Sequence, residues 1–393
     1  MEANRFNGTA GIVIEDAGII DGKEQSYRFF SPKEIPNDLT YPNSTIKLLA
    51  NASLCIGELK GLAKNISKST LDLFIKAYKR REAWLSTKIE GTNVSLTDVF
   101  LSEAGSIGKI GYRDMIKEIM NYIHSLDNAL RRLSNGFDIN RDLVNEMHHT
   151  LLGGVRGSNR LLGEYRKVQN WIDGKQWQSA SFIPPHYNLV ENLMEHMFAF
   201  MRKEDDIPRL IKIGLMHYYF ETIHPYEDGN GRLGRTLITL YLIKQGIIEE
   251  PIFYVTPFFE RNRRRYYDTL TKVREEGDFL SWLDFFLEGI CQTSQETSKK
   301  IKILINLRED YHKKLEEINA NTISFTLLDL FFENPYWSIP HIKKYKIKKN
   351  YPLIKRGMDN LMEIGLVEEH TIRRRNKFYW AREIASVFES DQS

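Results

Sequence analysis

Residues 224–235 combine the side-chain types that phosphoryl or nucleotidyl transfer requires. His224 is the group in this stretch whose ordinary pKa lets it take up a proton near neutral pH, as a general base must. Asp228 supplies the hard carboxylate oxygen that Mg²⁺ accepts when it is held jointly with phosphates. A base and a metal ligand four residues apart therefore predict a catalytic loop.

The second half of this stretch is suited to binding phosphate. Gly229, Asn230 and Gly231 give the backbone freedom for a tight turn that opens a helix, and the first-turn amides of a helix attract anions. Arg232 and Arg235 lie three residues apart, on one face of that helix, and add positive charge. A purely structural turn does not require a base, an acid and two arginines, so the combination favours a nucleotide site.

Two helices are expected to hold this loop. Apolar residues recur at helical spacing over residues 207–222 and again over 235–245. Pro225 disfavours the α conformation at His224, so the first helix should end there. The second helix should begin near Asn230.

The stretch resembles the signature of the Fic family, His-x-Phe-x-Asp/Glu-Gly-Asn-Gly-Arg-x-x-Arg, with Tyr226 at the phenylalanine position, which is usually a packing position. The resemblance implies a protein adenylyltransferase that moves AMP from ATP to a Ser, Thr or Tyr hydroxyl, with Mg²⁺ present. It implies that His224 and Asn230 are catalytic and that Asp228 is the metal ligand. A different donor, such as a phosphocholine donor, stays open. The implied nucleotide-binding residues are Gly229, Asn230, Gly231, Arg232, Leu233, Gly234, Arg235 and Asn262.

A helix predicted over residues 70–90 carries a second motif. Ser86-x-x-x-Glu90-Gly resembles the inhibitory motif, Ser/Thr-x-x-x-Glu-Gly/Asn, of Fic proteins whose inhibitory helix precedes the core. The resemblance implies that Glu90 reaches Arg235 and occupies the space of an ATP γ-phosphate. Taken alone, Glu90 could equally pair with a nearby lysine or face water. A further alternative is that Glu90 orders a water and the same pocket removes AMP from proteins.

Two flanking segments also resemble parts of a Fic core. Residues 163–185 predict a hairpin around the Asp173-Gly174 turn and are similar to the flap that aligns the backbone of a target protein. Residues 260–270 hold several arginines and two tyrosines, which could bind nucleic acid. They also resemble the Fic helix near the base and ribose, with Asn262 as the contact and Tyr266 or Tyr267 as packing.

The composition is that of a soluble globular protein with two or three domains: 393 residues, 42% hydrophobic and 27% charged. A net charge of +3 gives no global attraction to nucleic acid or membranes. Without an apolar leader or a membrane-length segment, a cytoplasmic location is expected. Cys55 and Cys291 are expected to be reduced, buried thiols rather than a disulfide.

The remaining pattern is mostly helical. Turns and a short hairpin are expected before residue 40, helices from Tyr41 and over 112–133 and 139–152, and a loop over 97–105. A core helix over 279–286 and a separate charged connector helix over 293–317 should follow. Adjacent His148 and His149 point in different directions on a helix, which disfavours a paired metal site.

The C-terminal part predicts three helices, 326–333, 339–345 and 351–364, and a strand pair within 368–380, which resembles a winged-helix module. Such modules bind DNA, or serve as protein-contact or dimer modules, so DNA and a homodimer are both candidate partners. The residues that make this module basic are Lys343, Lys344, Lys346, Lys348, Lys349, Lys355 and Arg356, with Arg373 to Arg375 on the wing.

The expected fold class is therefore mainly α: a Fic-type helical core with a small β-hairpin flap, plus a C-terminal winged-helix domain. The expected domains are an N-terminal Fic-associated helical region (1–110) with the inhibitory helix at about 70–91, a Fic core (111–292), a helical connector (293–320) and the winged helix (321–393). A DNA-binding regulator with a nucleotide-sensing pocket is the alternative from another functional class.

Overall fold

The computed structural model describes residues 6, 8–20, 22–105, 112–155, 161–174, 176–373 and 376–390. The chain forms two compact units: unit 1 is Met1–Gly57, Met120–Glu249 and Phe253–Thr293, and unit 2 is Glu58–Ile119, Glu250–Ile252 and Ser294–Ser393. Both units combine segments that are distant in sequence. They cut across the four expected domains, whose boundaries remain a prediction. None of the helices in these described ranges is long and apolar enough to cross a membrane.

Unit 1 begins with an antiparallel hairpin of β1 (Gly11–Ile20) and β2 (Lys23–Pro32), paired from Gly11↔Pro32 to Ile20↔Lys23. The sequence predicted a hairpin here, but the strands are ten residues long rather than short. The aromatic side chains of β2 form a small hydrophobic cluster with Ile183. The hairpin is thus packed onto a segment far along the chain.

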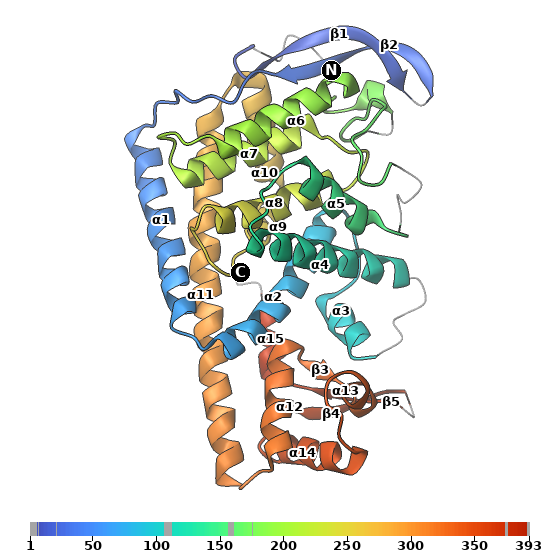
Figure 1. Cartoon of the computed structure of the whole chain (residues 1–393), viewed down its shortest axis with the longest axis vertical. Helices are drawn as coiled ribbons and strands as arrows, with labels where there is room; N and C mark the ends of the chain where they lie inside the picture. The colour runs from blue at the N-terminus through green and yellow to red at the C-terminus, as the bar shows by residue number, and fades with distance from the viewer. Residues whose placement is uncertain are drawn as a thin grey trace. The chain divides into compact units, whose positions relative to one another are not determined.

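A buried helix organises unit 1. Every residue of α7 (Arg209–Ile223) from Leu210 onwards is buried, and α7 packs against α6 (Tyr187–Arg202) and α8 (Asn230–Lys244) (Figure 1). A helix that is buried on all sides needs apolar residues all round, which the sequence of α7 supplies. The other helices of this unit are α5 (Arg141–Leu152), α9 (Thr256–Arg261), α10 (Arg263–Glu276), most of α1 (Asn43–Lys64) and of α4 (Arg113–Ser134), and the first part of α11 (Phe279–Glu317).

The helix α11 corrects one prediction. Trp282 is fully buried and its Nε1 donates to the carbonyl of Gly214, 2.9 Å away, so the expected core helix is confirmed. The expected break before residue 293 is wrong, because α11 runs unbroken for 39 residues. Gly289 does not end it: a Cβ there would lie 2.6 Å from the Phe258 ring, so glycine permits close packing instead.

The two cysteines also differ from expectation. Cys55 of α1 and Cys291 of α11 form a disulfide within unit 1, with their Cα atoms 5.1 Å apart. Their sequence separation of 236 says nothing about their distance in space once the two helices pack together. The Thr45 hydroxyl donates to the Asp284 carboxylate at 2.6 Å and links the same pair of helices.

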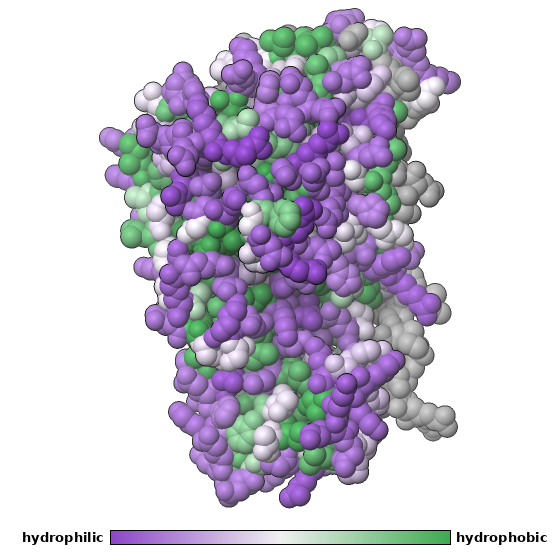
Figure 2. All heavy atoms as spheres, in the orientation of Figure 1, coloured by the Kyte–Doolittle hydropathy of each residue, from purple (hydrophilic) through white to green (hydrophobic). Residues whose placement is uncertain are grey.

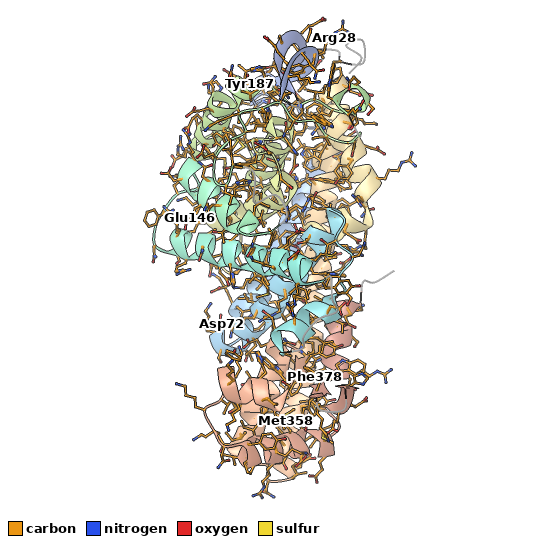
Figure 3. The ribbon with its side chains drawn as sticks, turned by 90° about the vertical axis from the view of Figure 1, so that its right-hand side faces the viewer. Arg28, Asp72, Glu146, Tyr187, Met358 and Phe378 are labelled. Carbon is orange, nitrogen blue, oxygen red and sulfur yellow. A yellow bond between two sulfur atoms is a disulfide. The ribbon has the colours of Figure 1, made fainter. Side chains whose placement is uncertain are left out.

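Unit 2 contains the predicted helix α2 (Lys68–Ile89) and a C-terminal module. The module has the predicted three helices, here α12 (Thr322–Glu333), α13 (Ile339–Tyr345) and α14 (Tyr351–Glu363), around buried residues such as Met358 and Phe378 (Figure 3). Its identity as a winged helix stays a prediction, and the basic turn Arg373 to Arg375 lies outside the described side chains. Its strands, in the sheet order β3-β5-β4, are β3 (Tyr336–Trp337), β4 (Glu368–Arg373) and β5 (Asn376–Trp380), and a final helix, α15 (Arg382–Glu389), follows.

The expected loop at residues 97–105 is wrong, because α3 (Leu96–Glu103) occupies it. A capping box starts this helix: the Ser95 hydroxyl accepts from the Asp98 amide, and the Asp98 carboxylate accepts from the Ser95 amide. This reciprocal cap satisfies two first-turn amides. Val99 and Phe100 bury the inner face of the helix.

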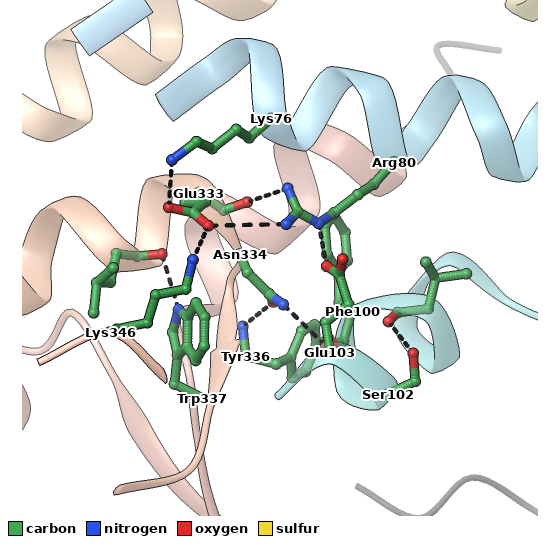
Figure 4. Close-up of polar contacts among 12 residues, drawn as sticks. Lys76, Arg80, Phe100, Ser102, Glu103, Glu333, Asn334, Tyr336, Trp337 and Lys346 are labelled. Atoms are coloured by element: carbon green, nitrogen blue, oxygen red, sulfur yellow. Dashed lines mark hydrogen bonds and ion pairs between the residues drawn. The ribbon is translucent and has the colours of Figure 1, made fainter. Parts of the chain in front are cut away.

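A buried carboxylate connects α2 to the C-terminal module inside unit 2. Glu333, at the end of α12, has a side chain only 5% exposed and pairs with Lys76 and Arg80 of α2 and with Lys346 after α13 (Figure 4). Burial raises the pKa of the Glu333 carboxyl, but the hydrogen bonds from Lys346 and Lys76 outweigh it and leave the pKa below its usual value. The ionised group is thus held by three cations.

Hydrophilic residues dominate the face of the molecule in Figure 2, and hydrophobic residues show there only in small groups. This is the expected distribution when the large apolar side chains are packed inside.

Candidate active site

The chain leaves α7 through a left-handed turn at His224. This residue has φ 49° and ψ 62°, and its amide still donates to the carbonyl of Phe220 at 3.0 Å. A positive φ is uncommon for a residue other than glycine, and histidine is among the residues that adopt it more readily. The predicted helix end before Pro225 is confirmed, and His224 lies half-buried at the start of the loop.

A buried arginine fixes this turn. The Arg166 Nε donates to the His224 carbonyl at 3.0 Å, and its NH2 group donates to the carbonyls of Ile223 and Pro185. The NH1 group reaches the carbonyl of Val168 at 3.4 Å. Burial lowers the pKa of Arg166 to about 9, so the group stays charged at neutral pH. No sequence signal indicated this role, because the four carbonyls come from three segments that converge only in the fold.

The loop ends where α8 begins, as predicted. Gly229 precedes the helix with φ 78°, and the Leu233 amide donates to the Gly229 carbonyl at 3.0 Å. The three amides before Leu233 therefore lie outside the helical hydrogen-bond ladder. A Cβ at Gly229 would also lie 3.3 Å from Leu151, so both conformation and space require glycine.

Asn230 braces the loop. Its buried side chain accepts from the Tyr226 amide at 2.9 Å and donates to the Tyr226 carbonyl at 2.8 Å. One donor and one acceptor of the side-chain amide are thus used inside the loop, which the sequence did not indicate. Its expected role at the α-phosphate stays a prediction and falls mainly on its backbone amide.

Asp228 has a partly exposed carboxylate in the loop. Its Oδ1 accepts from the Gly229 amide at 2.6 Å and pairs with Arg232 at 3.4 Å, while the side chain remains 38% exposed. Within the described residues, no group of three or more His, Cys, Asp or Glu could hold a metal by itself. A single carboxylate fits Mg²⁺, which takes its other ligands from phosphates and water.

The remaining residues of the signature are buried. Arg232 is 5% exposed and Arg235 2% exposed, so both cations lie inside the protein. Leu233 is core, and a Cβ at Gly234 would collide with the Glu221 carboxylate of α7. Gly234 therefore serves the close packing of α7 and α8. The expected nucleotide contacts of these four residues stay a prediction.

A neutral histidine supports the loop from α5. The His148 Nδ1 accepts from the Gly163 amide at 2.9 Å, so its Nε2 carries the proton and donates to the Asp228 carbonyl at 3.2 Å. Burial lowers the pKa of His148 to about 4. The His148 and Tyr226 rings stack with their centres 4.0 Å apart, which confirms the ring of the signature as a packing residue. His148 is buried and His149 exposed, so the adjacent histidines point in different directions, as predicted.

The flap segment is less regular than predicted. The expected hairpin is reduced to one bridge, Ile172↔Phe182, with Asp173 and Gly174 at positive φ and a short 3-10 turn, Trp177–Ser179. The Asn170 side chain donates to the Tyr226 carbonyl at 3.0 Å and ties the segment to the loop. On its other side, the Phe30 amide of β2 donates to the Ile183 carbonyl at 3.0 Å. The N-terminal hairpin thus braces the flap, a role that the sequence did not indicate.

The helix after the loop contains the last expected contact. Asn262 joins α9 to α10, and its side chain donates to the Phe258 carbonyl at 3.0 Å. Tyr266 is packing: it is buried and its hydroxyl hydrogen-bonds with His217 at 2.9 Å, while Tyr267 is 41% exposed. Nucleotide contact by Asn262 remains a prediction.

The inhibitory motif lies on α2 in unit 2, whereas the loop lies in unit 1. Ser86 is fully buried, and Glu90 is exposed and forms the C-terminal cap of α2. Gly91 follows with φ 99°, which confirms the predicted helix end. The inhibitory role of both residues remains a prediction.

Comparisons with known proteins find a family whose model spans the loop. The Fic/DOC family model matches residues 138–242, and the model of the Fic/DOC family N-terminal region matches residues 46–131. A probable protein adenylyltransferase of Aquifex aeolicus is 26% identical over 69% of this chain and 87% of its own length. The protein adenylyltransferase Fic of Aedes aegypti is 29% identical over 43% of this chain, which spans only 32% of that protein.

Solved structures support the fold. A Fic family protein from Desulfovibrio desulfuricans superimposes with a TM-score of 0.56 at 20% identity, covering 87% of this chain and 97% of the other. Fic-1 from C. elegans gives 0.51 at 19% identity, covering 67% and 74%. The helical core and its interhelical loop define a Fic fold. The chain carries a Fic/DOC domain and a Fic/DOC N-terminal region, and together with relatives named protein adenylyltransferases this identifies it as a nucleotidyltransferase enzyme.

Replacing Arg166 should destabilise unit 1. Arg166→Ala leaves four backbone carbonyls without their donor, and unsatisfied buried groups cost about 1–3 kcal/mol each, so a loss of roughly 3 kcal/mol or more is expected in urea unfolding. Arg166→Lys should recover only part of it. Arg264→Ala, at a side chain 95% exposed, is the control and should stay within about 0.5 kcal/mol. Equal stabilities of the two alanine variants would contradict the clamp.

The protein should lose stability below pH 6.5 partly through His148. The pKa of this group is about 4 in the folded state and 6.5 in the unfolded state. Between these values the unfolded state binds more protons, so the free energy of unfolding decreases as the pH is lowered. The loss from pH 7 to pH 5 is about 2 kcal/mol for this residue. His148→Asn removes the titration and should flatten urea-unfolding stability over that interval, whereas His149→Asn should not. An unchanged slope in His148→Asn would refute the assignment.

Proposed function

We propose that the protein transfers AMP from ATP to a Ser, Thr or Tyr hydroxyl of a target protein. The observation that carries this proposal is the loop from His224 to Gly229, which leaves one helix in a left-handed turn and opens the next. A base, a carboxylate and helix-start amides are thereby held in one short segment. The names of the Aquifex and Aedes relatives support adenylyl transfer and ATP as the donor.

In this mechanism the His224 imidazole takes the proton of the target hydroxyl. The hydroxyl oxygen then bonds to the α-phosphorus, and the bond from that phosphorus to the pyrophosphate oxygen breaks. AMP ends on the protein and pyrophosphate leaves. The Arg166 hydrogen bond to the His224 carbonyl holds the backbone of the base at a fixed place during this step.

The start of α8 receives the phosphates. The backbone amides of Asn230 and Gly231 lie in the first turn of the helix, where partial positive charge stabilises charge that grows on the α-phosphate. Asp228 would hold Mg²⁺ against the phosphates, and the bound ion would neutralise their charge. Arg232 and Arg235 would hold the polyphosphate tail, and Asn262 would contact the nucleoside.

The flap would present the target. It is anchored to the loop by Asn170 and to β2 by Ile183, so its position relative to His224 is fixed within unit 1. Its edge would align an extended target segment by strand addition, which uses backbone hydrogen bonds and tolerates many sequences. The hydroxyl of that segment would then reach the base.

The transfer would be inhibited by Glu90. A carboxylate at the C-terminal end of a helix faces the negative end of the helix dipole, so pairing with a cation stabilises it. We propose Arg235 as that cation. The pairing would withdraw a phosphate-binding group and occupy the place of the γ-phosphate.

Incubation with α-labelled ATP and Mg²⁺ tests the transfer and its inhibition together. Glu90→Gly should raise the label on protein, because the competing carboxylate is gone. His224→Ala should lower it by about 10²- to 10⁴-fold, the usual worth of a general base, in both the wild-type and the Glu90→Gly background. His149→Ala, at an exposed histidine, is the matched control and should leave the label unchanged.

Three outcomes would count against these assignments. Nucleotide binding by Glu90→Gly without labelled protein would show a sensor rather than a transferase. Wild-type protein that strips AMP from prelabelled target faster than Glu90→Gly does would show that removal is the main reaction. Equal labelling by wild type and Glu90→Gly would remove the inhibitory role and leave the transfer standing.

A further inference from the structure

Positive charge is concentrated in one short part of unit 2. Residues 334–358 contain seven Lys or Arg and no Asp or Glu, in a chain with 55 basic and 52 acidic residues. They cover α13, the following turn and the first half of α14. The exposed members are Lys343, Lys344, Lys346, Lys348, Lys349 and Arg356. The five other than Lys346, which pairs with Glu333, are called the basic face here.

Ion pairs do not occupy the charges of the basic face, although the Lys344 Nζ lies 4.7 Å from the centre of the Tyr345 ring. Of the seven cations, Lys346 pairs with Glu333 and Lys355 with Asp359. The other five make no ion pair within the part of the chain that the structure describes. Their charge is thus available to an anionic partner.

The basic face is held on a rigid support. Ile342, Ile347 and Ile354 bury the inner side of the two helices and their turn. The Asn350 side chain accepts from the Leu353 amide at 3.1 Å and fixes the start of α14. Cations on packed helices lose less conformational entropy on binding than cations on a disordered segment.

Two aromatic rings accompany the cations. Tyr345 is 57% exposed and Tyr351 48% exposed, and each neighbours a lysine or follows one closely in sequence. Rings beside cations suit a partner that carries sugars and bases as well as phosphates. A membrane surface would instead call for an apolar face, and Met362 is the one other exposed large hydrophobic residue among the described residues of α13 and α14.

We propose that the basic face binds duplex nucleic acid, with its lysines and Arg356 on the phosphates and the two tyrosines against the sugar backbone. A surface of one sign of charge matches the uniform charge of a phosphate backbone. A surface that binds an acidic protein would be expected to carry interleaved positive and negative charges, because these fix how two protein surfaces align. Because the contacts are to phosphate, the affinity should depend on salt more than on base sequence.

The test is fluorescence anisotropy of a labelled duplex of about 20 base pairs with the full chain, at about 50 to 200 mM salt. Lys348→Glu/Lys349→Glu should weaken binding by about tenfold or more and reduce the slope of log Kd against log salt by about 2. Lys299→Glu/Lys302→Glu changes the charge equally at two exposed lysines of α11 and should bind like wild type. Equal affinities of wild type and Lys348→Glu/Lys349→Glu would overturn the proposal, as would binding to phosphatidylserine vesicles without binding to the duplex.

A separate observation concerns the control of the site. The helix α2 is anchored to the C-terminal module between residues 74 and 81: Lys76 and Arg80 pair with Glu333, and the Arg81 Nε donates to the Phe388 carbonyl at 2.9 Å. The Phe74 and Phe332 rings lie 5.9 Å apart. The same helix continues without a break to Ser86 and its cap at Glu90.

We infer that the C-terminal module, through Glu333, sets the position of Glu90 and therefore the degree of inhibition; this rests on the inhibitory role proposed for Glu90. An α-helix is stiff over three turns, so a shift at Lys76 and Arg80 moves its C-terminal end as well. The inhibitory carboxylate thus depends on residues more than 200 positions away in sequence. A change that breaks the Glu333 ion pairs should therefore weaken the inhibition by Glu90 and increase AMP transfer.

Labelling with α-labelled ATP tests this coupling. Glu333→Gln should raise the label on protein by roughly fivefold or more, the lower end of usual coupling between sites, and should add nothing in the Glu90→Gly background. Lys76→Met leaves Arg80 and Lys346 paired with Glu333 and should give a smaller rise in label. This milder variant keeps the coupling testable if Glu333→Gln does not fold. Asp329→Asn breaks the α11–α12 pair with Arg308 without touching α2 and should behave like wild type.

The outcomes separate the coupling from the inhibition. Thermal melting first establishes that Glu333→Gln and Lys76→Met are folded. If both then carry the same amount of label as wild type while Glu90→Gly carries more, the coupling is overturned. If Glu90→Gly itself labels no more than wild type, the inhibition and the coupling both fall.

Discussion

The active loop depends on one buried cation. Arg166 carries its charge into the core and spreads it over four backbone carbonyls, two of which are the last carbonyls of α7 and its cap. A helix end has carbonyls without partners, and cations near it satisfy them and complement the helix dipole. Because the same guanidinium also binds the carbonyls of Pro185 and Val168, the flap segment and His224 are positioned by a single group. Burial lowers its pKa only to about 9, so the clamp does not open in the neutral range.

The rest of the loop is held by neutral groups, which leaves its ionised ones for chemistry. Burial keeps His148 unprotonated, and its tautomer is set by the Gly163 amide, so its remaining proton goes to the Asp228 carbonyl. Asn230 closes the loop onto Tyr226 with two neutral hydrogen bonds. The charged contact of Asp228 is its ion pair with Arg232, whereas the contacts from His148 and Asn230 add no charge beside the carboxylate. Residues that brace the loop, such as Asn230 and Tyr226, thus alternate along the signature with the residues proposed for chemistry, and Asn230 belongs to both groups.

Local signals in the sequence carried the prediction of this loop, and non-local packing accounts for what was missed. Pro225 and Gly229 act on their own backbone and neighbours, so both helix ends could be predicted from them. The capping box at Ser95 is local too and could have revealed α3. By contrast, the Cys55–Cys291 disulfide and the Arg166 clamp depend on which helices and segments meet, and spacing along the chain does not determine that. The single long helix α11 depends on both local sequence and packing. Its sequence has a glycine but no proline, and Gly289 stays helical with the Phe258 ring packed against it.

The position of α2 shows why a sequence motif does not define a regulatory domain. The motif from Ser86 to Glu90 spans five residues at the end of α2. This helix packs against α12 and α15, which follow the Fic/DOC domain in the sequence. Glu333 makes the dependence specific, because a carboxylate that is almost fully buried is stable only while its cations stay in place, and breaking a buried pair is costly. Lys346, one of those cations, follows α13 directly and is flanked in sequence by the lysines of the basic face. A ligand on that face would therefore act beside an ion pair that already fixes α2, so binding and inhibition need no further connecting element.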